Sequence, residues 1–233
     1  SYTKAIEFAP QNAQARLGRA ISRIEDGSLD AAQNDIQVVL RQQTPPRLAH
    51  HLNGIVLFRR GKYDDASAAF ELARRGAEGY PPAVLWLGLT AYAKKDFEQA
   101  IEHLTAFSRM APEAADAKAL LAYLHARAGG KPAAAKILDS LKNVNLENPM
   151  SLANIGQAYM LIGEKDLAVA TLKRAADKQP GSAESQMQFA SALLAKGDTE
   201  LAITKLDTAL QLDPKSQKAE ELKVRALLND KRY

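Results

Sequence analysis

The chain has 233 residues, a net charge of +4 and no cysteine. The lack of cysteine excludes disulfides, thiolate metal sites and a cysteine nucleophile, and no apolar run is long enough to span a membrane. Six phenylalanines, seven tyrosines and one tryptophan supply little aromatic bulk for one large core, whereas the abundance of alanine favours closely packed helices.

A 34-residue repeat runs along the chain. Its marker is an alanine that recurs without insertion or deletion at Ala32, Ala66, Ala100, Ala134, Ala168 and Ala202. Further apolar residues follow each alanine after four and seven positions, a spacing that traces one face of a helix. Twelve positions before each alanine stands a small residue: Ala20, Gly54, Gly88, Ala122, Gly156 or Ala190. The small residue and the alanine predict two helices in close approach.

Glycine marks the turn between the two helices of a unit. Five positions before the alanine stands Gly27, Gly61, Gly129, Gly163 or Gly197, and in the remaining unit Lys95 takes this place. Because glycine adopts the left-handed conformation at little cost, we expect it to end the first helix. The loops between units share a proline position, occupied by Pro10, Pro112, Pro180 and Pro214, where proline stops the preceding helix.

The repeat divides the chain in order. Residues 1–12 match the end of a second helix. Six full units follow, at residues 13–46, 47–80, 81–114, 115–148, 149–182 and 183–216. Residues 217–233 match the first helix of a further unit or a polar cap, and residues 231–233 align with residues 61–63. Because neither end falls at a unit boundary, we expect the parent chain to continue in both directions.

Two of these units are weaker than the others. Arg19 and Arg23 stand where the first helix of unit 13–46 should be apolar, and Lys118 and His125 interrupt unit 115–148 in the same way. Repeat arrays tolerate such units because neighbouring repeats share their stability.

The sequence contains no pattern that predicts catalysis. The histidines at positions 50, 51, 103 and 125 lack a second metal ligand at helical spacing. Residues 128–132 lack the first glycine and the Ser or Thr of a phosphate-binding loop, and they occupy the turn of their unit. We therefore predict a chain that is not an enzyme and that has no catalytic residue, no cofactor and no metal.

The 34-residue period, the order of small, glycine, alanine, hydrophobic and proline positions, and the helix–turn–helix pattern together resemble the tetratricopeptide repeat (TPR). The resemblance covers the chain from residue 1 to residue 233 as a single array. It implies an all-α, right-handed superhelical solenoid of about fourteen antiparallel helices. It also implies a non-enzymatic scaffold that binds a peptide or protein segment in a concave groove lined by the first helices.

Candidate groove residues follow from a helical wheel. Repeat positions 2, 5, 9, 12 and 13 lie opposite the face that packs on the second helix, and large apolar residues on an open face mark a binding site. The candidates are Ile55, Phe58, Arg59, Leu85, Leu89, Tyr92, Tyr123, Arg127 and Met160. The two arginines would take a carboxylate or backbone carbonyls. His51 falls on the same stripe, whereas Trp86 and Tyr159 face neighbouring helices. The competing interpretation is that each candidate packs against its neighbours.

A finer resemblance rests on residues 13–20 (AQARLGRA) and 85–89 (LWLGL). These segments are similar to bacterial TPR lipoproteins of exopolysaccharide export that accompany the PEP-CTERM/exosortase system. The resemblance implies an envelope-anchored, periplasmic protein, and a generic bacterial scaffold in the cytoplasm is the alternative.

Two other classes of partner would require different surfaces. A polysaccharide-binding or helical-repeat enzyme-associated module would use groove aromatics such as Tyr92 and Tyr123. Nucleic-acid binding would require a continuous basic stripe. The groove supplies only Arg59, Arg127 and His51, so we expect no nucleic-acid partner.

Overall fold

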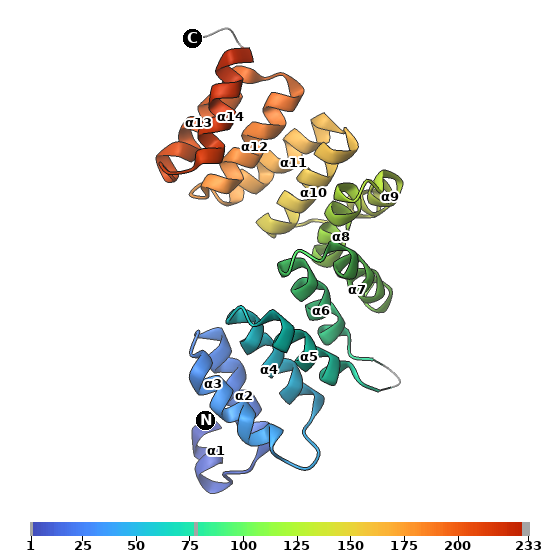
Figure 1. Cartoon of the computed structure of the whole chain (residues 1–233), viewed down its shortest axis with the longest axis vertical. Helices are drawn as coiled ribbons and strands as arrows, with labels where there is room; N and C mark the ends of the chain where they lie inside the picture. Colours follow the sequence, from blue (N-terminus) through green and yellow to red (C-terminus); the bar gives the residue numbers. More distant parts are fainter. Residues whose placement is uncertain (1, 77–78, 230–233) are drawn as a thin grey trace. The chain divides into compact units, whose positions relative to one another are not determined.

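The computed structural model describes residues 2–76 and 79–229, and these residues form fourteen helices (Figure 1). Contacts divide the chain into two compact units, residues 1–111 (unit 1) and residues 112–233 (unit 2). Within each unit, consecutive helices pack against one another as antiparallel pairs. The fold is therefore all-α, as the sequence predicts. Residues 231–233, which align with residues 61–63, lie outside the described part of the chain.

Unit 1 contains seven helices. They are α1 (Tyr2–Phe8), α2 (Ala13–Glu25), α3 (Leu29–Leu40), α4 (Arg47–Arg59), α5 (Tyr63–Arg74), α6 (Pro81–Ala93) and α7 (Phe97–Met110). Unit 2 contains α8 (Ala115–Arg127), α9 (Lys131–Leu141), α10 (Pro149–Ile162), α11 (Lys165–Lys178), α12 (Ala183–Lys196), α13 (Thr199–Leu212) and α14 (Gln217–Asn229). The even-numbered helices from α2 to α14 all begin at the same position of the repeat, so their spacing equals the period of the alanines.

The turns inside the pairs adopt the conformation that the sequence predicts. Gly163 and Gly197 cap α10 and α12 with φ angles of 101° and 99°, and the glycines at positions 27, 61 and 129 also have positive φ. Lys95, which occupies the same slot after α6, has a φ angle of 64°. The turn therefore imposes a left-handed residue even where the sequence does not supply glycine.

The small residue of each first helix makes room for a large side chain on the second helix. A Cβ atom added to Gly54 would lie 2.5 Å from Phe70, and one added to Gly156 would lie 2.4 Å from Leu172. The repeated alanines from Ala32 to Ala202 are fully buried as well. The sequence correctly predicts the close approach, and the structure identifies the large residue four positions after the alanine as the group that fills the space.

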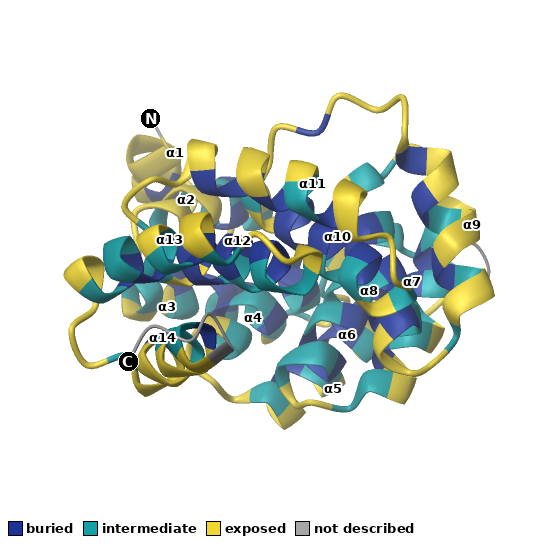
Figure 2. Cartoon of the chain, turned by 90° about the horizontal axis from the view of Figure 1, so that it is seen from above, coloured by how far each residue is buried: buried dark blue, intermediate teal, exposed yellow. Residues whose placement is uncertain are grey.

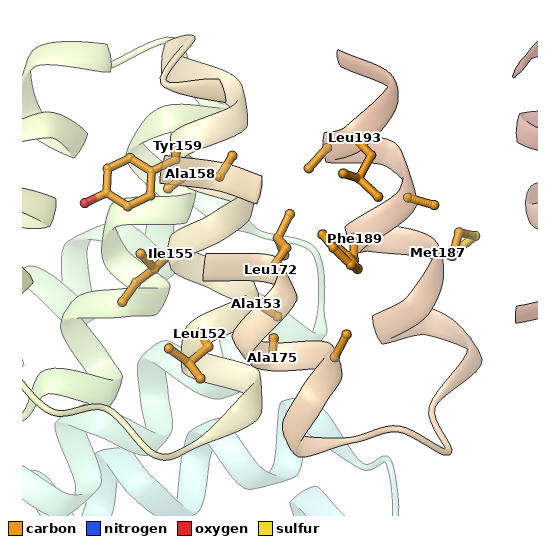
Figure 3. Packing of buried hydrophobic residues seen from close by; sticks show 14 of the residues in the cluster. Leu152, Ala153, Ile155, Ala158, Tyr159, Leu172, Ala175, Met187, Phe189 and Leu193 are labelled. Carbon is orange, nitrogen blue, oxygen red and sulfur yellow. The ribbon is translucent and has the colours of Figure 1, made fainter. Parts of the chain in front are cut away.

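The core of unit 2 is one apolar cluster that extends from α8 to α14. Leu152, Ile155 and Tyr159 of α10 and Phe189 and Leu193 of α12 belong to it, and Ile155 and Tyr159 point away from α12 (Figure 3). Tyr159 is buried, which confirms its predicted position on a packed face. Figure 2 shows buried residues along most of α10, whereas α14 is largely exposed. The buried core of unit 2 thus lies against one face of its even-numbered helices.

Candidate functional site

A groove of about 550 Å³ lies across the even-numbered helices of unit 2. We call it the unit 2 groove. Its lining comprises Tyr123 and Arg127 from α8, Gln157, Met160 and Leu161 from α10, Leu172 from α11, Glu184, Met187, Gln188 and Ser191 from α12, and Lys218, Glu221, Leu222 and Arg225 from α14. The first helices of four successive repeats therefore contribute to one surface.

The floor of the groove is apolar. Met187 is 4% exposed and Leu172 is 1% exposed, so both are anchored in the core of the unit. Met160 and Leu222 are half-buried and pack against the same core cluster, and Leu161 is exposed. Methionine is unbranched and polarizable, so it can adapt its shape to different apolar side chains. The floor thus offers an adaptable apolar surface that rests on the buried core of unit 2.

The rim of the groove carries both signs of charge. On α12, Glu184 accepts a 2.7 Å hydrogen bond from Gln188 and lies 4.0 Å from the ammonium of Lys218 on α14. On α8, Arg127 donates a 3.1 Å hydrogen bond to the hydroxyl of Tyr123. These polar groups surround an apolar floor, which is the distribution of a protein-recognition surface with an apolar centre and a polar rim.

Three of the predicted groove residues meet in this site. Tyr123, Arg127 and Met160 all line the unit 2 groove. Gln157, Leu161, Met187 and Ser191, which occupy the same repeat positions, line it with them. The helical-wheel rule therefore selects, on α8, α10 and α12, the face that lines the unit 2 groove.

Sequence reasoning missed the part of the groove that α14 contributes. Lys218, Glu221 and Arg225 stand at positions 2, 5 and 9 of a unit that begins at residue 217, so the same rule applies to them. They were left out although residues 217–233 match the first helix of a further unit, because their polar side chains also suit a cap. Glu184, at position 2 of its unit, was missed because the candidates comprised large apolar residues, aromatic residues and arginines, and no acidic residue.

The predicted candidates of unit 1 have partners within the unit. Phe58 makes edge-on ring contacts with Tyr63 and Trp86, with centroids 5.3 Å and 5.1 Å apart. Trp86 also stacks on Phe70 at 5.7 Å, in agreement with its predicted packing role. Phe58 and Ile55 are half-buried against this aromatic cluster, so packing accounts for much of their apolar surface.

The remaining candidates of unit 1 are Arg59, Leu85, Leu89 and Tyr92. Arg59 is exposed and donates a hydrogen bond to the carbonyl of Ile24 in the last turn of α2, where a cation complements the helix dipole. Leu85 and Leu89 are half-buried, and Tyr92 is half-buried with its ring 6.0 Å from that of Phe97. These side chains lie on α4 and α6, and a role in binding stays a prediction for them.

The prediction that His51 lies on the open stripe was wrong. His51 is only 7% exposed, and its ring lies 5.7 Å from the ring of Phe70 and 5.3 Å from that of Tyr80. Burial among these rings lowers its pKa to about 4. Burial also lowers the pKa of His125 and of His50, where Arg75 adds to the effect.

Metal sites and membrane-spanning helices are absent from residues 2–76 and 79–229. Within these ranges, no group of three or more histidine, aspartate or glutamate side chains is placed to hold a metal ion. Over the same ranges, every helix is too short or too polar to cross a bilayer. The unit 2 groove, which gathers Tyr123, Arg127 and Met160, is the candidate functional site.

Family models agree with the repeat. A model described as "Tetratricopeptide repeat" matches residues 17–81, 51–107, 87–145 and 187–233, and a second model of the same description matches residues 151–184. Together these matches cover most of the chain. A comparison with curated proteins gives no match.

Solved structures with the same fold align with nearly the whole chain. The crystal structure of the APC/C hetero-tetramer Cut9–Hcn1 aligns with a TM-score of 0.81 at 20% identity, covering 97% of this chain and 45% of that chain. A tetratricopeptide repeat protein from Parabacteroides merdae aligns with a TM-score of 0.73 at 13% identity, and the alignment covers 95% of this chain and 88% of that chain. YrrB, described as a TPR protein with an unusual peptide-binding site, aligns with a TM-score of 0.51 at 18% identity, covering 96% and 98%.

Proposed function

Because the chain belongs to the tetratricopeptide repeat family of protein–protein interaction modules, we propose that the unit 2 groove binds a segment of a partner protein. The family is generally non-catalytic, and the groove offers surfaces for contact rather than groups arranged for chemistry. The chain would then act as a scaffold that holds its partner along α8, α10, α12 and α14.

One observation carries this proposal: the apolar floor at Met160, Met187 and Leu222 lies inside a rim of charged and amide side chains. A bound segment would place apolar side chains on the floor, where their removal from water supplies most of the binding energy. Its polar groups would meet Arg127 and Lys218 at the rim, which fix its position. The segment expected is therefore amphipathic, with apolar anchors flanked by polar residues.

The composition of the groove favours a protein segment over a polysaccharide. Sugar rings are held chiefly by exposed aromatic side chains, and Tyr123 is the one aromatic residue in the described lining. The methionines and leucines that replace aromatics are suited to apolar side chains of a peptide. The polysaccharide alternative therefore has less support from this site.

Peptides selected from a random library against the whole chain would test the proposal. We expect Met160→Asp to weaken binding of the selected peptides at least about tenfold, because it places a charge where an apolar anchor is desolvated. Leu167→Asp is the matched control, since Leu167 is an exposed apolar residue of α11 outside the groove lining. Equal affinity of both variants and the parent chain would show that the selected peptides bind elsewhere.

We also propose that this scaffold serves a bacterial envelope system of exopolysaccharide export or protein sorting. Residues 13–20 and 85–89 support this through their similarity to TPR lipoproteins of the PEP-CTERM/exosortase system. The full-length reading frame provides the test. A lipoprotein signal with a cysteine at its cleavage site is expected upstream, and a complete upstream sequence that lacks such a signal would contradict the envelope assignment.

A further inference from the structure

Three arginines of unit 1 converge on a single carboxylate. Arg16, Arg19 and Arg23 lie on one face of α2, and all three contact Asp35 of α3. Arg19 binds both oxygens of Asp35 through Nε and Nη2, at 2.8 Å and 2.7 Å. Arg16 and Arg23 each add one bond, at 2.9 Å and 2.7 Å. Arg19 and Arg23, which interrupt the apolar pattern of the first repeat, therefore form one ordered cluster with Arg16.

This cluster carries more positive than negative charge. The side chain of Asp35 is 2% exposed, whereas those of Arg16, Arg19 and Arg23 are 14%, 20% and 28% exposed. Burial opposes ionisation of Asp35, but hydrogen bonds from Arg19 and the charges of the three arginines outweigh it and lower the pKa of the carboxyl group. Three cations thus face one anion, and two positive charges are in excess.

The other bonds of the cluster are made to neutral groups or to exposed ones. Arg16 donates to the carbonyl of Pro10 at 2.6 Å, and Arg23 donates to the carbonyl of Ala31 at 3.0 Å. The carboxylate of Asp26 accepts a hydrogen bond from Ser28, which lowers the pKa of Asp26, and the charge of Arg23 contributes less to this shift. Because this carboxylate is fully exposed, it does not neutralise the cluster. The excess charge is therefore not neutralised at the cluster itself.

Each guanidinium keeps a terminal nitrogen without a protein acceptor. In the part of the chain that the structure describes, Nη2 of Arg16, Nη1 of Arg19 and Nη2 of Arg23 make no hydrogen bond to protein. An arginine carries five N–H donors in a rigid plane, which suits the oxygens of a phosphate or carboxylate. Because Asp35 already holds the three side chains in place, a ligand would not have to order them.

From this geometry we propose that Arg16, Arg19 and Arg23 bind a phosphate group. A phosphate monoester carries a charge of about −1.5 to −2 at neutral pH, which matches the two positive charges in excess, whereas a single carboxylate would neutralise one. The phosphate oxygens would accept from the open guanidinium nitrogens, while Asp35 continues to hold the arginines from the buried side. This site lies on α2 and α3 in unit 1 and is independent of the unit 2 groove.

Thermal unfolding of the whole chain in phosphate and in chloride at equal ionic strength tests the site. We expect phosphate in excess of its dissociation constant to raise the Tm of unit 1 by about 2 °C or more. Phosphate also stabilises proteins in general through exclusion from their surface, so the comparison needs a variant. Arg23→Gln removes the most exposed arginine and leaves Asp35 paired with Arg16 and Arg19.

The variants separate a built site from a general salt effect. In calorimetric titrations, Arg23→Gln should bind inorganic phosphate at least about tenfold more weakly than the parent chain. Arg109→Gln, which removes an exposed arginine of α7 in the same unit, should bind it unchanged. If the parent chain and Arg23→Gln respond equally to phosphate, or if the parent chain binds neither inorganic phosphate nor a phosphopeptide, the proposal is wrong.

A second titration identifies where the phosphate comes from. A peptide with one phosphoserine among glycines and its unphosphorylated form are compared with inorganic phosphate. Binding of the phosphopeptide but not of free phosphate would place the group on a partner protein, and binding of free phosphate alone would place it on a small molecule. Both results support the site provided that Arg23→Gln weakens the binding at least about tenfold. A parent chain that binds neither inorganic phosphate nor the phosphopeptide overturns it.

Discussion

His51 lies in the aromatic cluster of unit 1 as a neutral base. Its ring contacts Phe70 and Tyr80, and among the described residues its Nδ1 has no hydrogen-bond partner. The cause of its low pKa is burial, which penalises the charged imidazolium. A buried base of this kind makes the stability of unit 1 depend on pH.

The direction of this dependence follows from the two pKa values. Above about pH 6.5 the histidine is neutral in both the folded and the unfolded chain, and its contribution to stability is complete. Between about 6.5 and about 4 only the unfolded chain binds the proton, so the free energy of unfolding falls as the pH falls. We expect a loss of about 2 kcal/mol between pH 7 and pH 5 from this residue.

Urea unfolding followed by the fluorescence of Trp86, the only tryptophan, measures this effect because Trp86 packs on Phe70 in the same cluster. His51→Leu should remove most of the pH-dependent loss. His103→Leu, which changes a histidine that lines an open cavity on α7, should leave the loss intact. A pH dependence that is the same in the parent chain and in His51→Leu would exclude His51 as its source.

The turn between α6 and α7 differs from the other turns within helical pairs because it contains a lysine where they contain glycine. Lys95 takes the left-handed conformation that glycine takes elsewhere, and a side chain in this conformation costs about 1–2 kcal/mol. The cost persists because the turn must still reverse the chain and pack α7 on α6.

Exchanging residues between two equivalent turns tests this cost. Lys95→Gly should raise the free energy of unfolding of unit 1 by about 1 kcal/mol, since the strain is relieved and part of the gain is lost to the greater freedom of the unfolded chain. Gly61→Lys, in the turn after α4, should lower it by a similar amount, and open space surrounds that position. Urea midpoints measured with Trp86 provide both values. A destabilised Lys95→Gly variant would show that the lysine side chain itself holds the turn.

The architecture as a whole is largely predictable from the sequence because the repeat is exact. The alanine that recurs with the 34-residue period sets the register of the helices, and the glycines at positions 163 and 197 mark the ends of α10 and α12. The same register identifies Tyr123, Arg127 and Met160 as neighbours on the first helices of successive repeats. These features are local or periodic, and a helical wheel captures them.

Other features depend on contacts between distant residues and cannot be predicted in this way. The burial of His51 depends on Tyr80, a residue before α6 whose ring no periodic rule places. From the sequence, Arg19 and Arg23 of α2 are interpreted as an interruption of an apolar face, because Asp35, the partner that they share with Arg16, lies on the next helix. Lys218, Glu221 and Arg225 of α14 do follow the periodic rule, and they were left out only because charged residues of this helix also suit a polar cap.

The central claim is that a protein segment binds in the unit 2 groove. The four methionines provide a direct measurement, since their labelled methyl groups give separate NMR signals. Met160 and Met187 line the groove, whereas Met150 is 68% exposed at the start of α10 and Met110 ends α7 in unit 1. On addition of a selected peptide, we expect the Met160 and Met187 signals to shift and those of Met110 and Met150 to stay in place. Shifts at Met110 or Met150 with unchanged signals from Met160 and Met187 would contradict the claim.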